Sequence, residues 1–206
     1  FMGASSFNGD LSSWDVSNVT SMVAIFQEAT NFTSDLSNWN VSNVMDMTGA
    51  FFRAANFTSN LSNWDVSNVE AMGRMFGDAI SFESNLSSWD VSGVIDMHRM
   101  FDTASSFDSD LSNWDVSSVT NFTSMFTSSG FSDENKCAIH TSWSSNENWP
   151  YDWSETCNSE PVVFQPQTKE ELQTAVDLWV DDNATALATY GEINTWDCLL
   201  YTSDAA

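Results

Sequence analysis

The sequence predicts a tandem-repeat fold of the α/β class, a right-handed solenoid of 25-residue strand–helix units. Three observations lead to this prediction. Tryptophan recurs every 25 residues, and the sequence motif LS[SN]W[DN]VS[NGS]V surrounds each tryptophan. After that motif, the distance between successive apolar residues lengthens to three or four positions. A fixed period of this length is typical of proteins in which one supersecondary unit stacks on the next. The recurring tryptophans are Trp14, Trp39, Trp64, Trp89 and Trp114.

The phrase around each tryptophan predicts a short, half-buried strand. In the second unit, Trp39 and Val41 alternate with Asn40 and Ser42. Successive side chains of a strand point to opposite faces, so the tryptophan and the valine would face inward and the polar pair outward. The outward pair would repeat in every unit.

The second half of each unit predicts a helical segment. Val44, Met47, Phe51 and Ala54 lie three or four residues apart, which places them on one face of one or two helical turns. A single unit cannot shield its own aromatic side chains. We therefore expect each Trp, Leu and Phe to lie over its equivalent in the neighbouring unit, as part of one continuous core.

The repeated phrase, followed by the pattern M-x-x-M-F-x-x-A-x-x-F, resembles the BspA-like leucine-rich-repeat surface proteins, whose 25-residue repeat was first noted in mycoplasma surface lipoproteins. The resemblance covers residues 1–130 and implies a leucine-rich-repeat-like solenoid in a secreted or surface-anchored protein with a role in adhesion. One departure is that valine, for example Val44, stands where the general leucine-rich pattern has a buried asparagine. A straight solenoid without an internal asparagine ladder is the expectation.

The period stops near Gly130, and residues 131–157 are predicted to form a C-terminal cap. A short helix is expected from Glu134 to Trp143, and three tryptophans in this segment could cover the apolar end of the last unit. A disulfide between Cys137 and Cys157 would close the cap and would fit an oxidising, extracellular compartment. Two reduced thiols are the alternative.

The remaining residues resemble the helical N-terminal cap and first strand that open another array in the same family, which implies the start of a second array. Residues 158–167 are interpreted as a linker, and 168–197 as a helical N-terminal cap with a first strand, because Thr168-x-x-Glu171 is a capping box and Ile193-x-x-Trp196-Asp197 restores the repeat register. Residues 198–206 break that register and are interpreted as a non-native tail, with a divergent native end as the alternative. Phe1 falls inside a repeat, so we expect the native N-terminus to lie upstream.

The strong negative charge of the chain limits the classes of molecule that it could bind. The chain of 206 residues has 29 Asp plus Glu against 5 Lys plus Arg, a formal net charge of -24. Nucleic acid and anionic membranes would be repelled, which leaves cations, neutral sugars and basic proteins as partners. No apolar run reaches the ~18 residues of a membrane span. A monomer or an array within a larger protein is expected.

The outward strand positions are the candidate binding surface. They form a column of Asp or Asn and a column of Ser, two residues apart. Calcium bridging of the carboxylates is one hypothesis, with Asp65, Asp90 and Asp115 as weak metal candidates. Hydrogen bonds from the following turn to the carboxylates are the favoured alternative. The candidate positions are Asp15, Ser17, Asn40, Ser42, Asp65, Ser67, Asp90, Ser92, Asp115 and Ser117.

No catalytic motif is visible, and an enzyme is not expected. His98 and His140, the two histidines, have no nucleophile or metal partner in the sequence. No cofactor is predicted apart from the possible calcium. The expected function is a non-enzymatic, extracellular or cell-surface module that mediates adhesion or binds protein or glycan through its polar, acidic face. A calcium-stabilised structural or extracellular-matrix solenoid is the alternative.

Overall fold

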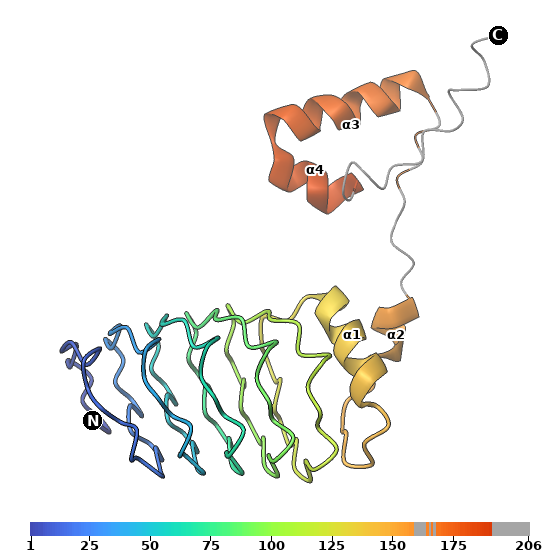
Figure 1. Cartoon of the computed structure of the whole chain (residues 1–206). Helices are drawn as coiled ribbons and strands as arrows, with labels where there is room; N and C mark the ends of the chain where they lie inside the picture. Colours follow the sequence, from blue (N-terminus) through green and yellow to red (C-terminus); the bar gives the residue numbers. More distant parts are fainter. Residues whose placement is uncertain (159–163, 165, 167, 191–206) are drawn as a thin grey trace. The chain divides into compact units, whose positions relative to one another are not determined.

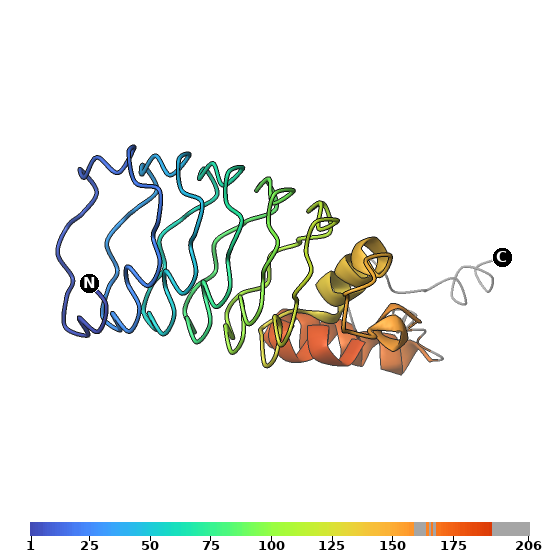
Figure 2. The same ribbon diagram turned by 90° about the horizontal axis from the view of Figure 1, so that it is seen from below.

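The structure is a computed structural model that describes residues 1–158, 164, 166 and 168–190. The chain divides into two compact units, Phe1–Cys157 and Asn158–Ala206. The first unit contains the repeats, followed by helix α1 (Asp133–Trp143) and all but the last residue of helix α2 (Ser154–Asn158). The second contains helices α3 (Lys169–Asp181) and α4 (Asn183–Tyr190). Figures 1 and 2 show the repeats following one another in the first unit, from blue to green, with α1 and α2 after the last.

The predicted strand–helix solenoid is wrong. In residues 1–130 the structure has turns in place of both elements, and parallel strand pairing is reduced to isolated bridges such as Ser21 with Asp46 and Asp46 with Ala71. No sheet is present in the described residues. The leucine-rich-repeat-like arrangement implied by the resemblance is therefore not supported. We call residues 1–130 the repeat stack.

Side-chain acceptors explain why the predicted strand is a turn. The Asp15 carboxylate accepts a hydrogen bond from the Ser17 backbone N–H, and the Val19 N–H donates to the Val16 carbonyl. Asp and Asn commonly bind the backbone two residues on and so divert it from a ladder. The predicted orientation of these side chains is nevertheless confirmed: Trp39 and Val41 are buried, and Asn40 is exposed.

Left-handed residues explain why the predicted helix is a chain of turns. Ala24 and Glu28 have φ of 54° and 59°, and the equivalent positions are left-handed in the later repeats. A helix requires right-handed dihedrals throughout. Here every second backbone N–H group donates its hydrogen bond to a neighbouring repeat and not within its own repeat. Met22, Ala24, Phe26 and Glu28 donate to carbonyls of the next repeat at 2.7–2.9 Å.

The predicted in-register stacking of equivalent aromatic side chains is confirmed. Successive rings of the Phe26 column lie 5.5–6.0 Å apart, within 17° of parallel, from Phe26 to Phe126. The Phe32 column repeats this at 5.7–5.9 Å as far as Phe107. Both columns belong to one continuous buried core. Each repeat thus buries its aromatic side chains against its neighbours.

Helix α1 begins at Asp133, one residue from the predicted start, with the Ser132 side chain accepting from the Asn135 N–H. The predicted Cys137–Cys157 disulfide is confirmed. Beyond α2, the Thr168 side chain accepts from the Glu171 N–H, which confirms the capping interaction at the start of α3. The predicted first strand around Trp196, the tail at 198–206 and most of the predicted linker lie outside the described residues.

Candidate binding surface

The ten predicted surface residues form two columns, which we call the Asx column and the serine column. Asp15, Asn40, Asp65, Asp90 and Asp115 make up the Asx column, and the Ser two residues after each makes up the serine column. In the first four repeats one Oδ1 accepts both the serine N–H, at 3.0–3.2 Å, and the serine O–H, at 2.6–2.7 Å. At Asp115 the Ser117 N–H donates at 3.0 Å. The favoured alternative, hydrogen bonding to the turn, is therefore confirmed.

These turns also favour the charged form of the carboxylates. The Ser17 hydroxyl and N–H lower the pKa of Asp15, and Ser92 and Ser117 do the same for the pKa of Asp90 and Asp115. The neighbouring Asp115 charge opposes this effect at Asp90, but it is the smallest of the causes. The turn therefore favours the charged form of Asp15, Asp90 and Asp115.

A second acidic column uses the same turn. The Asp10 carboxylate accepts from the Ser12 N–H at 2.9 Å, and Asp35, Asn60, Asn85 and Asp110 accept in the same way in later repeats. The pKa values of Asp10 and Asp35 are lowered by these hydrogen bonds. The repeat stack thus presents two parallel acidic columns.

A second set of serines, nearly buried and hydrogen-bonded to the backbone, was not predicted from the sequence. Ser59 and Ser84 are only 7% exposed, and their hydroxyl oxygens accept the N–H of Leu36 and Leu61 at 2.8 and 2.9 Å. Each hydroxyl also donates to the Asx side chain at position 35 or 60 in the preceding repeat, at 3.3 Å. A serine directly before four of the five Asx residues of the second column, at the 25-residue period, was the available signal.

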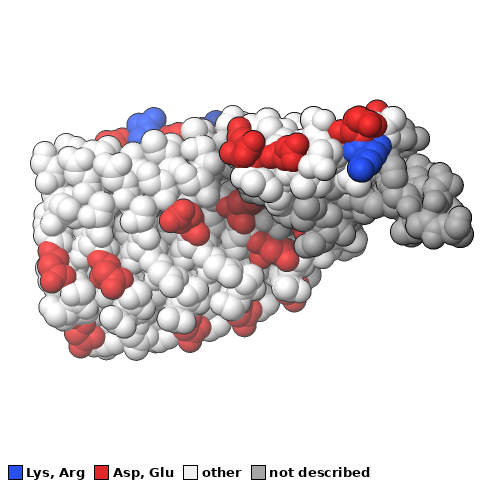
Figure 3. Space-filling view, turned by 90° about the horizontal axis from the view of Figure 1, so that it is seen from above, with Lys and Arg blue, Asp and Glu red and all other residues white. Residues whose placement is uncertain are grey.

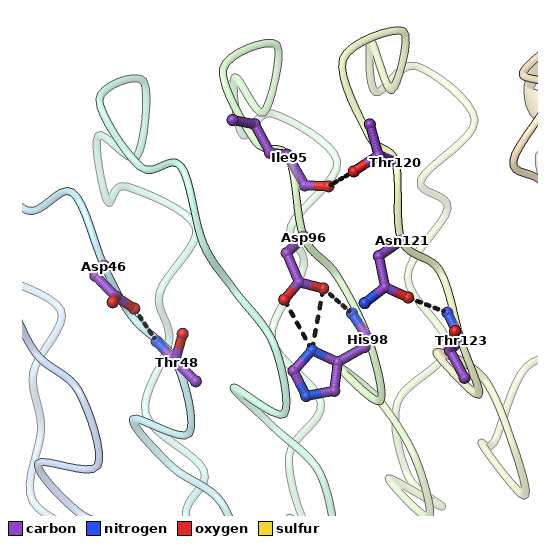
Figure 4. Close-up of polar contacts among 8 residues, drawn as sticks. All are labelled: Asp46, Thr48, Ile95, Asp96, His98, Thr120, Asn121 and Thr123. Atoms are coloured by element: carbon purple, nitrogen blue, oxygen red, sulfur yellow. Dashed lines mark hydrogen bonds and ion pairs between the residues drawn. The ribbon is translucent and has the colours of Figure 1, made fainter.

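A third set of turns lies at the residues that form the isolated β-bridges between repeats (Figure 4). Asp46, Asp96 and Asn121 each accept, through Oδ1, the N–H of the residue two places on, at 2.8–3.1 Å. At Asp96 the His98 ring Nδ1 also lies 2.9 Å from Oδ2. A Cβ at Gly73, the equivalent of His98 in the preceding repeat, would collide with the His98 ring, so glycine there makes room for the imidazole.

Basic side chains are few, and Arg53, Arg99 and Lys136 pair with carboxylates. Arg53 lies between Glu28 and Asp78 of the adjacent repeats, at 3.1 and 3.4 Å, and its guanidinium stands 4.8 Å from the Phe52 ring centroid. Figure 3 shows acidic side chains spread over the face displayed, with few basic ones between them. The face displayed in Figure 3 therefore carries more acidic than basic side chains among the described residues.

Within the described residues, no group of three or more His, Cys, Asp or Glu is placed to hold a metal ion. His140 accepts a hydrogen bond from the Trp149 indole at 3.3 Å, and His98 contacts Asp96, so each histidine has a structural partner. None of the helices in the described residues has the length and apolar character needed to cross a bilayer. These contacts give no catalytic arrangement at either histidine.

The stacked, hydrogen-bonded 25-residue units define a tandem-repeat protein. The model of the family described as "Mycoplasma protein of unknown function, DUF285" matches residues 1–79 and 35–138, and the chain belongs to this family. No curated protein and no solved structure matches the chain.

Proposed function

We propose that this chain is a non-enzymatic, extracellular or cell-surface module that binds protein or neutral glycan through the Asx and serine columns. The observation that carries the proposal is their regularity. Every repeat presents an exposed Asp or Asn and a Ser held by the same turn. A rigid surface whose groups recur at each repeat suits a partner with recurring groups of its own, because little ordering entropy is lost on binding.

Two further features support this proposal. The family match agrees with the resemblance to BspA-like surface proteins, which are implicated in adhesion. The disulfide between Cys137 and Cys157 is of a kind that persists in oxidising compartments, such as the cell surface. Protease treatment of intact cells tests the location: a surface protein is digested, whereas an internal one survives.

Binding is tested with the full chain on immobilised neutral oligosaccharides and on immobilised extracellular matrix proteins. The double variant Asp65→Asn, Asp90→Asn removes two charges from the Asx column. It keeps the turn, because Asn40 already makes that turn with Ser42. We expect retention of the partner to fall at least about threefold, as for exposed polar contacts.

Asp78→Asn is the matched control. The Asp78 side chain is partly exposed and pairs with Arg53, but Asp78 does not belong to the Asx column. Equal retention by the double variant and the wild type would refute the proposal. A melting temperature measured in excess EDTA separates it from the calcium-stabilised alternative. We expect no change, because the described residues contain no group of three or more His, Cys, Asp or Glu placed to hold a metal ion.

A further inference from the structure

A cleft lies between the last repeat and the segment that follows it. Its volume is about 400 Å³. One wall comes from the end of the repeat stack and the other from the end of α1 and the turn after it. The lining residues are Trp114, Asp115, Val116, Ser117, Ser142, Trp143, Ser145, Asn146, Glu147 and Asn148.

The cleft exists because the chain stops repeating here. Inside the repeat stack, Asn43 and Asn68 donate their side-chain N–H to the carbonyls of Ser17 and Ser42 in the preceding repeat, at 2.7 Å. After the last repeat, Asn146 instead donates to the carbonyls of Val116 and Val119, at 2.8 and 3.0 Å. This anchors the turn at 145–148 beside the last repeat without closing the space in front of Asp115.

The two walls each carry one carboxylate. Asp115 is fixed by the Ser117 N–H at 3.0 Å. Glu147 lies in the turn that the Asn148 N–H closes on the Asn146 side chain at 2.8 Å. The rest of the lining consists of serine hydroxyls, asparagine side chains, Val116 and two buried indoles, with no Lys or Arg. The cleft is therefore rich in acceptors and negatively charged.

We propose that this cleft binds an arginine side chain of a basic partner protein. A guanidinium has five N–H donors and no acceptor, which matches a lining of two carboxylates and neutral oxygens. The net charge of -24 would steer a basic partner towards the molecule. A neutral sugar would leave both carboxylates without a countercharge. The proposal goes beyond the proposed function, because only the last repeat borders this cleft.

The test uses the full chain and an acetylated, amidated Gly-Arg-Gly peptide. Indole N–H signals in NMR spectra report binding, because Trp114 and Trp143 line the cleft. We expect saturable shifts of these two signals, with no such shifts for the peptide in which citrulline replaces arginine. Asp115→Asn and Glu147→Gln should each weaken binding about threefold, and the double variant about tenfold.

Asp110→Asn is the matched control. Asp110 makes the same kind of turn in the last repeat, belongs to neither the Asx column nor the serine column, and does not line the cleft, so its variant should bind the peptide as the wild type does. The proposal is overturned if no saturable shift occurs, if citrulline binds equally, or if Asp110→Asn weakens binding as much as Asp115→Asn. Saturable binding of a neutral oligosaccharide with the same dependence on Asp115 and Glu147 would also overturn it, in favour of a glycan site.

Discussion

At the residue scale, the indole N–H of each inner tryptophan ties one repeat to the one before. Trp39, Trp64, Trp89 and Trp114 donate to a leucine carbonyl of the preceding repeat at 2.9–3.0 Å and are 4% exposed. Trp14, in the first repeat of the sequence, is 52% exposed. Trp143 continues the column, 6.1 Å from Trp114 and within 15° of parallel, but its buried Nε1 has no hydrogen-bond partner.

This difference predicts unequal costs for the same substitution. Trp114→Phe removes a buried hydrogen bond to the Leu86 carbonyl, which keeps only the Trp89 backbone N–H as a donor, whereas Trp143→Phe removes a donor that is already unsatisfied. The loss of buried indole volume is similar in both. Trp114→Phe should therefore lower the free energy of unfolding by at least about 1 kcal/mol more than Trp143→Phe. Urea denaturation measures both, and equal losses would contradict the hydrogen-bond assignment.

The serine hydroxyls predict a specific pH dependence. Ser92 lowers the pKa of Asp90 in the folded state, so its contribution is present above the unfolded pKa and is lost as pH falls through the lowered folded value. Ser92→Ala should therefore lower the melting temperature at about pH 6 and have a smaller effect at about pH 2. Ser62→Ala, beside the uncharged Asn60, is the control whose effect should not change with pH in this way. A constant Ser92→Ala effect would count against the assignment.

At the element scale, the asparagine bridges between neighbouring repeats are incomplete. Asn43 and Asn68 each bridge to the preceding repeat, but the next position in the series is Gly93. A Cβ there would meet the Ser67 and Val69 carbonyl oxygens at 3.6 Å, an ordinary contact distance. The site thus has room for a side chain and an acceptor within reach.

Gly93→Asn should therefore stabilise the protein. The new amide is expected to donate to the Ser67 carbonyl, as Asn68 does to Ser42, and to add about 1 kcal/mol to the free energy of unfolding. Gly93→Ala is the control, because it gives the same loss of glycine freedom without the donor. Thermal unfolding of the two variants compares them. If alanine stabilised as much as asparagine, the bridge would not explain the gain.

At the scale of the whole first unit, the last repeat is covered by side chains of residues 131–157. The Phe126 N–H donates to the Tyr151 hydroxyl at 2.9 Å, and the Phe126 ring lies 5.6–6.2 Å from the rings of Trp149, Tyr151 and Trp153. The disulfide joins α1 to α2 around this cluster. The cluster therefore closes the apolar end of the repeat stack.

Reduction of Cys137–Cys157 should loosen residues 131–157 before the repeat stack. The disulfide restricts the unfolded conformations of the segment it closes, while the repeats are held by hydrogen bonds and ring stacking that reduction leaves intact. Amide hydrogen exchange with and without reductant measures this. We expect faster exchange in residues 131–157 and little change at residues 44–104. Unchanged protection of 131–157 would contradict the expected role of the disulfide.

The core and the surface columns could be predicted from the sequence, but the backbone between them could not. Val44, Met47, Phe51 and Ala54 have a spacing that buries them in a helix and equally in this chain of turns. Glycine would have indicated the left-handed positions, yet among the described residues with a positive φ only Gly3 and Gly49 are glycines. Ala24 and Arg74 adopt the same conformation without a signal in their residue type. The turns within the candidate site followed from the Asp-x-Ser pattern, whereas the cleft depends on where the repeats end.

Residue-resolved amide exchange tests the central claim, that each repeat is held by hydrogen bonds and side chains of the next. The N–H groups of Arg74 and Arg99 donate to the next repeat at 2.7 and 2.9 Å. Ser124 occupies the equivalent position in the last repeat, where the described part of the chain gives its N–H no acceptor. We predict strong protection at Arg74 and Arg99 and rapid exchange at Ser124. Equal exchange at the three positions would contradict the stacked arrangement.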